Sequence, residues 1–192
     1  MKKLEERIKT DGKVLPGDIL KIDNFLNHQI DVKLMDEIGE EFHQIFKDTK
    51  PDKILTIESS GIAIASAAAR CFGYIPVVFA KKTVAANMAK ETYEATERSY
   101  TRDLVYTVQV AKEFLNEGDR ILILDDFLAR GEAMNALIKI CDQAKATIVG
   151  CGSVVAKVYQ PGEQRIKDLG YDVKVLARVK SMSDDGSIEF ED

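Results

Sequence analysis

The sequence predicts an α/β fold with a mainly parallel, twisted sheet that is flanked by helices. Short apolar runs typical of buried strands alternate along the chain with segments whose apolar residues recur at helical spacing. The chain has 192 residues, enough to bury one α/β core, and it contains no internal repeat or low-complexity linker. We therefore predict a single domain over residues 1–192.

The first elements of this fold are an irregular N-terminal segment and a well-marked helix. Residues 1–31 mix polar and apolar side chains, with a short helix expected at Lys3–Lys9 and a turn at Pro16-Gly17. Asp31 is placed to cap a helix over roughly Val32–Lys47, where apolar residues recur every three or four positions.

Strands and helices alternate after that helix. Because parallel strands are joined by right-handed crossovers, the loops that follow them meet at one sheet edge, where ligands bind in such folds. Three unusual loops, Glu58–Gly61, Lys81–Asp103 and Asp125–Ala133, are expected there. The expected strands are Lys53–Ile57, Val77–Ala80, Leu104–Val110, Arg120–Leu124, Thr147–Val158 and Val173–Val179, and the expected helices are Ile62–Phe72 and Gly131–Ala144.

The composition argues against several classes of protein. The net charge is -5 and the pI is about 5.2, whereas nucleic-acid-binding proteins usually present a basic face. No apolar run approaches the length of a membrane span, and no apolar signal segment follows the N-terminal lysines. The cysteines, Cys71, Cys141 and Cys151, form no CxxC pair and are expected to be reduced. We therefore expect a cytoplasmic protein that binds neither nucleic acid nor membrane.

The strongest functional motif lies at residues 121–133. An apolar run ends in Asp125 and Asp126, and a short loop of small residues then opens a helix at Gly131. Small residues let a phosphate approach the backbone, where the free N–H groups of the loop and the first helical turn face it. Paired carboxylates accept hydrogen bonds from ribose hydroxyls and bind metal-bound water. The motif therefore favours a sugar-phosphate site.

Asp125 and Asp126 have two other interpretations. Such a pair can simply end a strand and cap the next helix. It can also belong to the acidic metal site of a phosphotransfer receiver domain, but the second acidic cluster expected at an earlier strand end is missing. The unbroken apolar strand and the small-residue loop favour the sugar-phosphate site over both.

The sequence resembles the type I phosphoribosyltransferases, whose signature is an apolar strand, two acidic residues and a small loop with glycine. The resemblance is greatest to members that act on xanthine. It implies a purine-salvage enzyme that joins this 6-oxopurine to phosphoribosyl pyrophosphate (PRPP) with Mg²⁺, as a homodimer. In two departures from the family pattern, Ala129 and Ala133 replace small hydroxyl residues, and Arg130 replaces a small amide. The matching segments are Val14-Leu15, Ile19–Lys21, Phe25–Asp31, Thr56–Ala63, Pro76–Ala80, Asp125–Ala129 and Gln160–Gly162.

The resemblance also implies roles for the residues around PRPP. Asp125 and Asp126 are expected to be catalytic and to hold the ribose hydroxyls. No protein ligand of Mg²⁺ is assigned, since PRPP and water are expected to hold the ion. For Ser59, a plain helix cap is the alternative. The residues expected to bind PRPP are Ala129, Arg130, Gly131, Glu132 and Ala133 at the 5′-phosphate, and Ser59, Ser60 and Lys81 at the pyrophosphate.

Base recognition is expected outside the phosphate loops. By resemblance, Leu20 packs on the purine, Asn27 bonds its edge and Lys157 approaches an exocyclic oxygen, although a strand-end lysine can also simply extend into solvent. Residues 1–31 would form a hood with the base-recognition residues, and residues 82–103 a flexible loop that closes over PRPP. Two alternatives stay open: another base such as hypoxanthine or guanine, and a non-enzymatic regulator that senses PRPP.

Overall fold

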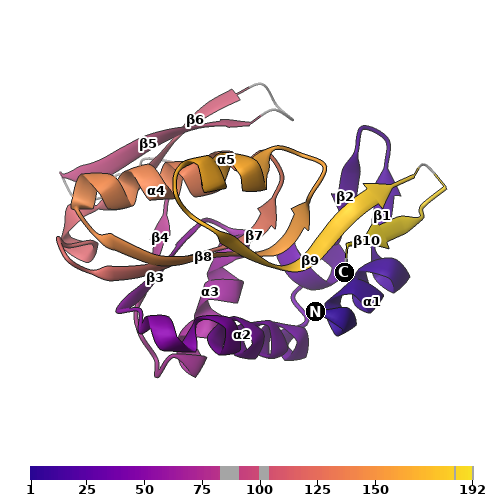
Figure 1. Ribbon diagram of the computed structural model, residues 1–192, viewed down its shortest axis with the longest axis horizontal. Coiled ribbons are helices and arrows are strands. Elements are labelled where there is room, and N and C mark those ends of the chain that lie inside the picture. The colour runs from indigo at the N-terminus through magenta and orange to yellow at the C-terminus, as the bar shows by residue number, and fades with distance from the viewer. Residues whose placement is uncertain (83–90, 100–103, 184, 192) are drawn as a thin grey trace.

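The computed structural model describes residues 1–82, 91–99, 104–183 and 185–191. Its centre is a six-stranded sheet in the order β10-β9-β8-β7-β3-β4 (Figure 1). Every neighbouring pair in it is parallel except β9 with β10. The carboxyl ends of the parallel strands therefore share one edge, as predicted. The strands are β3 (Lys53–Ile57), β4 (Val77–Ala80), β7 (Arg120–Leu128), β8 (Thr147–Lys157), β9 (Val173–Met182) and β10 (Ile188–Phe190).

Helices cover both faces of this sheet. α2 (Val32–Phe46) and α3 (Ser60–Cys71) lie on one face, and α4 (Glu132–Ala144) and α5 (Gly162–Asp168) lie on the other (Figure 1). Each face has its own cluster of buried apolar side chains, as expected for a sheet covered on both sides. Within the described part of the chain, none of the helices has the length and apolar character needed to cross a membrane.

The predicted cap of α2 is present. The Leu34 N–H donates to Asp31 Oδ1 at 3.1 Å, which satisfies one of the backbone donors that a helix start leaves unpaired. A short 3₁₀ turn at Lys47–Thr49 follows α2, and another at Lys112–Phe114 follows strand β6 (Leu104–Ala111).

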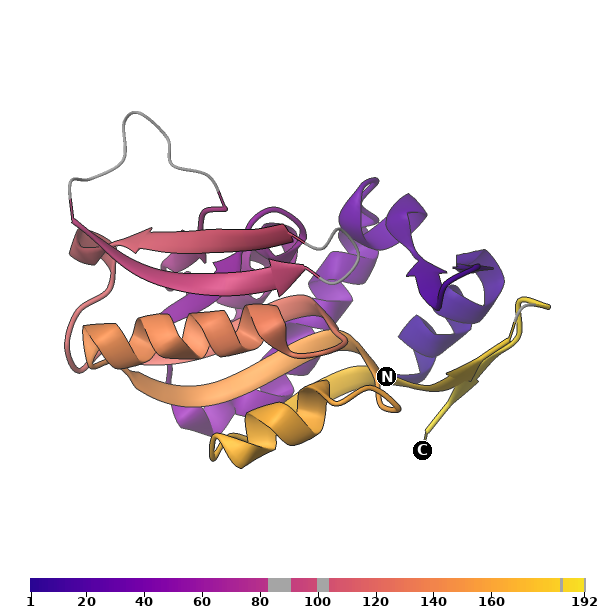
Figure 2. The same cartoon turned by 90° about the horizontal axis from the view of Figure 1, so that it is seen from above.

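The N-terminal segment is more regular than the sequence indicated. After α1 (Lys2–Asp11), strands β1 (Lys13–Leu15) and β2 (Ile19–Lys21) form an antiparallel hairpin, and a π-helical turn follows at Asp23–Asn27. These elements lie at the end of the molecule where β9 and β10 also lie (Figures 1 and 2). Strands of three residues are too short for a periodic pattern, so the sequence predicted the helix alone.

The segment expected to be a flexible loop contains a strand. β5 (Thr92–Ser99) pairs antiparallel with β6 (Leu104–Ala111), and this hairpin lies beside α4 (Figure 2). Residues 92–99 of this segment therefore have regular structure, and the closure of residues 82–103 over PRPP stays a prediction. Residues 83–90 and 100–103, which belong to the same predicted loop, lie outside the described residues.

The pattern of β5 was difficult to detect because Tyr93 and Ala95 are the apolar side chains that the described part of this strand turns toward the core. Ala95 is buried and faces the core on the side of α4. The Gln143 side chain of α4 pairs with the backbone of Glu94, accepting from its N–H at 3.2 Å and donating to its carbonyl at 2.7 Å. A side chain of α4 thus holds β5 in place, although the hydrophobic pattern of β5 does not predict a strand.

Strand β7 also differs from its prediction. The apolar run ends at Leu124, but the strand continues to Leu128. The reason is its partner β8, which keeps pairing through Asp125 with Ser153 and Leu128 with Ala156. The two aspartates therefore lie inside a strand rather than in the loop after it.

Candidate active site

The two aspartates of β7 differ in exposure. Neighbouring residues of a strand point to opposite faces. Asp125 is 3% exposed, and its Oδ1 accepts the backbone N–H of Asp126 at 2.9 Å. Asp126 is only partly buried. A ligand at this edge therefore reaches the carboxylate of Asp126 more directly, while Asp125 supports the backbone beneath it.

The loop after β7 presents backbone N–H groups at the start of α4. Gly131 has a φ of 75°, a left-handed conformation that glycine adopts without a steric penalty, and α4 begins at the next residue. The N–H groups of the first helical turn have no partner within the helix and carry its partial positive charge. This arrangement suits a phosphate.

Small residues are also required by packing in this loop. The Gly162 N–H donates to the Ala129 carbonyl at 3.1 Å. A Cβ atom placed at Gly162 would lie 2.5 Å from that same oxygen, and one placed at Gly131 would lie 3.1 Å from the Gly162 carbonyl oxygen. The predicted phosphate loop is therefore held against the start of α5.

The charged residues of the loop do not all face a ligand. The Arg165 guanidinium of α5 donates to the Glu132 carboxylate, and it reaches the Arg130 carbonyl at 3.5 Å. The Glu132 carboxylate is thus bound to a cation of the protein, and its backbone N–H remains the group suited to a phosphate. The side chain of Arg130 is exposed. Sequence reasoning missed Arg165 because it follows the loop by more than 30 residues.

The loop after β3 lies next to the aspartates. Ser59 is the residue before α3, but its side chain makes no capping hydrogen bond to the described helix. A Cβ atom placed at Gly61 would lie 2.0 Å from Thr56 Oγ1 and 3.7 Å from Asp125 Oδ1. The start of α3 therefore approaches Asp125 closely, and glycine is required at position 61.

The same loop is joined to the end of β4. The Glu58 N–H donates to the Ala80 carbonyl at 3.0 Å, and the Lys82 N–H donates to Glu58 Oε1 at 2.6 Å. The peptide bond between Glu58 and Ser59 is cis. These contacts bring Lys81 to the same edge as Ser59, as the order of strands predicted.

The N-terminal segment reaches the site through Asn27. Its Nδ2 donates to Asp126 Oδ2 at 3.3 Å, across 99 residues of sequence. Asn27 is exposed, whereas Leu20 is 8% exposed and packs within the core on the side of α2 and α3. The structure thus brings a predicted base-binding residue to a predicted ribose-binding residue.

Lys157 does not extend into solvent. It ends β8, is 7% exposed, and its ammonium donates to the Asp18 carbonyl and lies 3.5 Å from Asp18 Oδ2. The ammonium also lies 5.7 Å from the centre of the Phe127 ring. Asp18, at the tip of the β1–β2 hairpin, was not among the predicted site residues, because nothing local in the sequence links it to Lys157.

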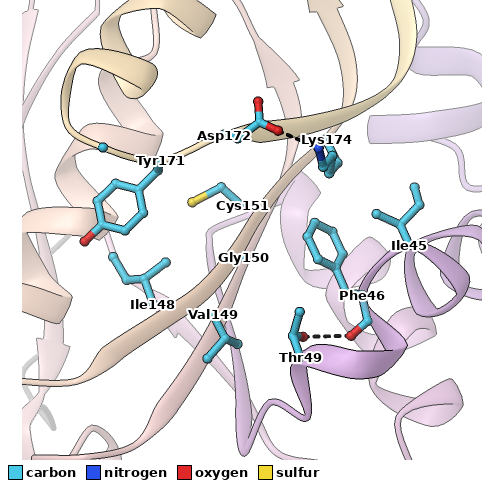
Figure 3. A pocket seen from close by; sticks show the side chains of 11 residues that line it. Ile45, Phe46, Thr49, Ile148, Val149, Gly150, Cys151, Tyr171, Asp172 and Lys174 are labelled. Carbon is cyan, nitrogen blue, oxygen red and sulfur yellow. Dashed lines mark hydrogen bonds and ion pairs between the residues drawn. The ribbon is translucent and has the colours of Figure 1, made fainter.

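A pocket of about 310 Å³ lies elsewhere, where β8 begins (Figure 3). Its lining is largely apolar, and the ammonium of Lys174 in it is paired with Asp172 at 2.5 Å. Cys151 also lines it, and burial raises the pKa of this thiol to about 12. The pocket contains none of the predicted site residues, which lie at the opposite edge of the sheet.

The chain is similar to known proteins over nearly its whole length. The model of the phosphoribosyl transferase domain matches residues 21–187. The chain is 50% identical to xanthine phosphoribosyltransferase 1 of Clostridium perfringens, covering 96% of this chain and 97% of the relative. It is also 50% identical to the xanthine phosphoribosyltransferase of Finegoldia magna over the whole of both chains.

The solved structures agree on the fold. Adenine phosphoribosyltransferase from Trypanosoma brucei, in complex with AMP, pyrophosphate and ribose-5-phosphate, has a TM-score of 0.78 at 18% identity. The match covers 95% of this chain and 82% of that one. Given this shared fold, the match to the family model and the identity to the curated relatives, the chain belongs to the phosphoribosyltransferase family.

Proposed function

We propose that this protein is a xanthine phosphoribosyltransferase, which converts xanthine and PRPP to xanthosine 5′-monophosphate and diphosphate in purine salvage. The observation that carries the proposal is the position of Asp126. It follows the apolar run of β7, precedes the phosphate loop and accepts a hydrogen bond from Asn27 of the N-terminal segment. The names of the relatives at 50% identity support xanthine as the base.

In this proposal the protein binds PRPP at three places along the sheet edge. The N–H groups of residues 129–133 hold the 5′-phosphate, and those of Ser59–Gly61 hold the pyrophosphate with help from Lys81. Asp126, supported by Asp125, accepts hydrogen bonds from the ribose hydroxyls. Alignment of the two substrates and stabilisation of the departing pyrophosphate supply the catalysis, so no protein nucleophile is needed.

Mg²⁺ fits this site as an ion that PRPP carries. No cluster of three or more His, Cys, Asp or Glu side chains in the described ranges is arranged to hold a metal. PRPP phosphates and water would hold the ion, and the partly exposed carboxylate of Asp126 would accept hydrogen bonds from its bound water. When bound, the ion would neutralise charge on the leaving pyrophosphate.

The base lies between the hood and the end of β8 in this proposal. Leu20 packs on the purine, Asn27 bonds its edge and Lys157 donates to an exocyclic oxygen. An ammonium donates hydrogen bonds and accepts none, so it favours a 6-oxopurine over a base with an amino group at that position. We also propose a cytoplasmic homodimer, which the family resemblance supports; sedimentation velocity tests the dimer.

The decisive experiment measures pyrophosphate release from PRPP and Mg²⁺ with xanthine, guanine, hypoxanthine, adenine and orotate in parallel. We expect the highest kcat/KM with xanthine. A preference for another base would contradict the base assignment but keep the enzyme class. Calorimetric binding of PRPP without turnover of any base would instead identify a PRPP sensor.

A further inference from the structure

Three side chains from one segment converge on Asp18. The Tyr159 hydroxyl donates to Asp18 Oδ1 at 2.5 Å, and Gln160 Nε2 donates to Oδ2 at 2.7 Å. The Lys157 ammonium contacts the carbonyl and the carboxylate of the same residue. These contacts join parts of the chain that are about 140 residues apart. Asp18, which lies in the hood, is therefore the partner in all of these polar contacts from the end of β8 and the residues that follow it.

Asp18 holds a backbone conformation that suits this role. It has a φ of 62° at the tip of the β1–β2 hairpin, a left-handed conformation that aspartate tolerates better than most residues. Burial raises the pKa of its carboxyl, but the hydrogen bond from Tyr159, the charge of Lys157 and the hydrogen bond from Gln160 outweigh burial, and the pKa is lowered overall. The carboxylate is therefore ionised at neutral pH.

The same segment contacts the phosphate loop at its other end. Gly162 follows Gln160 by two residues and donates its N–H to the Ala129 carbonyl at 3.1 Å. The approach of Gly162 to Gly131 is also close enough that a Cβ atom on either would press on the other. Residues 157–162 thus run from the lysine proposed to recognise the base to the loop proposed to hold the 5′-phosphate.

We propose that Asp18 is a positioning residue that fixes Lys157 and the β1–β2 hairpin in register with the phosphate loop, so that the base pocket is formed before the purine binds. The inference rests on the proposed function, because it assumes that Lys157 contacts the base. A buried ammonium needs a counter-charge and hydrogen-bond acceptors to keep one geometry. A pocket ordered in advance spares the purine the cost of ordering it, so Asp18 acts on base affinity.

The kinetic test uses Asp18→Asn, which keeps the size of the side chain but removes its charge and one acceptor oxygen. The control is Asp119→Asn, because Asp119 is also an aspartate paired with a lysine, Lys53 at 2.5 Å, far along the chain. We expect Asp18→Asn to raise the xanthine KM roughly tenfold, the worth of one charge-assisted hydrogen bond. The KM for PRPP should stay within about twofold, and Asp119→Asn should leave both constants near wild type. Equal xanthine KM values in the two variants would overturn the proposal.

A second variant separates the effect of the carboxylate from the effect of the left-handed backbone conformation at residue 18. Asp18→Gly keeps the left-handed conformation without strain and retains the carbonyl that accepts from Lys157. It should raise the xanthine KM at least as much as Asp18→Asn. A xanthine KM near wild type in Asp18→Gly would show that the carboxylate does not position the pocket.

Amide hydrogen exchange tests whether Asp18 restrains the β1–β2 hairpin, and this measurement does not depend on enzyme activity. Exchange across residues 13–21 should accelerate in Asp18→Asn and stay at the wild-type rate in Asp119→Asn. An unchanged exchange rate in Asp18→Asn would show that the contacts of Asp18 do not restrain the hairpin. Should wild-type protein turn over no base, the proposed function fails while this measurement still decides whether Asp18 holds the hood. Faster exchange with an unchanged xanthine KM would overturn the positioning role itself.

Discussion

The phosphate side and the base side of the site are built in different ways. On the phosphate side, the loop proposed for the 5′-phosphate consists of consecutive residues, from Asp125 to the start of α4, and it packs against Gly162 of α5. The base side is assembled from distant parts. Asn27 meets Asp126 across 99 residues, and Asp18 meets Tyr159 across 141.

This difference has consequences for stability and for mutation. Buried apolar neighbours and local backbone geometry hold the phosphate loop, so substitutions there disturb packing as well as binding. On the base side, polar contacts between distant residues add to the buried apolar side chains of the N-terminal segment, and each of these polar contacts is worth about 1–3 kcal/mol at most. We therefore expect changes on the phosphate side to affect turnover strongly, and changes on the base side to affect mainly base affinity.

The largest effect is expected for Asp126→Ala. It removes a carboxylate proposed to bind the ribose hydroxyls, and with it the partner of Asn27. The loss of a charge-assisted hydrogen bond of up to about 3 kcal/mol predicts a fall in kcat/KM of roughly 100-fold. The measurement is steady-state pyrophosphate release with xanthine as the base.

The matched control for this variant is Asp48→Ala, at an exposed aspartate after α2. It should retain wild-type kinetics, and both variants should melt close to wild type because neither residue is fully buried. Wild-type kinetics in Asp126→Ala would contradict the assigned ribose site.

Gly131→Ala tests the phosphate loop with a smaller change. Gly131 and Gly118 both have positive φ angles, 75° and 84°, so alanine at either costs about 1–2 kcal/mol of conformational strain. A Cβ atom at Gly118 would meet nothing within 4 Å, whereas one at Gly131 would press on Gly162. We expect Gly131→Ala to lose somewhat more stability than Gly118→Ala in denaturant unfolding, because its Cβ atom also presses on Gly162, and only Gly131→Ala to lose activity, by roughly tenfold. Equal activity in the two would show that the loop geometry does not matter for PRPP.

Gly61→Ala tests the contact between the start of α3 and β3. Its Cβ atom would overlap Thr56 Oγ1, a buried hydroxyl with no hydrogen-bond partner among the described residues. Overpacking of this kind costs about 1–3 kcal/mol. The double variant with Thr56→Ala removes the overlapping atom and should recover part of the melting temperature. A double variant less stable than Gly61→Ala would refute this explanation.

The sequence predicted the loop for the 5′-phosphate because the residues that define it are neighbours in the chain, whereas its contacts with Gly162 and Arg165 of α5 were not predicted. The apolar run of β7, the aspartates and Gly131 are neighbours, so their pattern specifies a strand edge and a helix start before any tertiary contact is known. Base-side residues could be named only by resemblance. Nothing near Asp18 or Arg165 indicates a partner, since their contacts depend on how the hairpin and α5 lie against the sheet. The sequence did not predict β5 for the same reason, because β5 is held by a contact with Gln143 of α4, which is distant in the chain.

The smallest expected effect concerns acid stability, and it compares one aspartate from the base side with one from the far end of β7. Burial raises the pKa of Asp119, but hydrogen bonds from Lys53 and from the Asn116 backbone outweigh it, and the pKa is lowered overall, as for Asp18. A carboxyl whose folded-state pKa is lowered stabilises the protein above its unfolded value of about 4. That stabilisation is lost as the pH falls through the folded-state pKa.

Asp119→Asn and Asp18→Asn should therefore both melt about 1–3 °C below wild type at pH 7, as expected for partly exposed ion pairs in a chain of this size. Differential scanning calorimetry should show both differences shrinking as the pH falls below about 4, because wild type then loses the same charge. A difference that persists or grows in acid would contradict the lowered pKa. The two variants should still differ in xanthine KM at pH 7, since only Asp18 contacts the lysine that the base is proposed to meet.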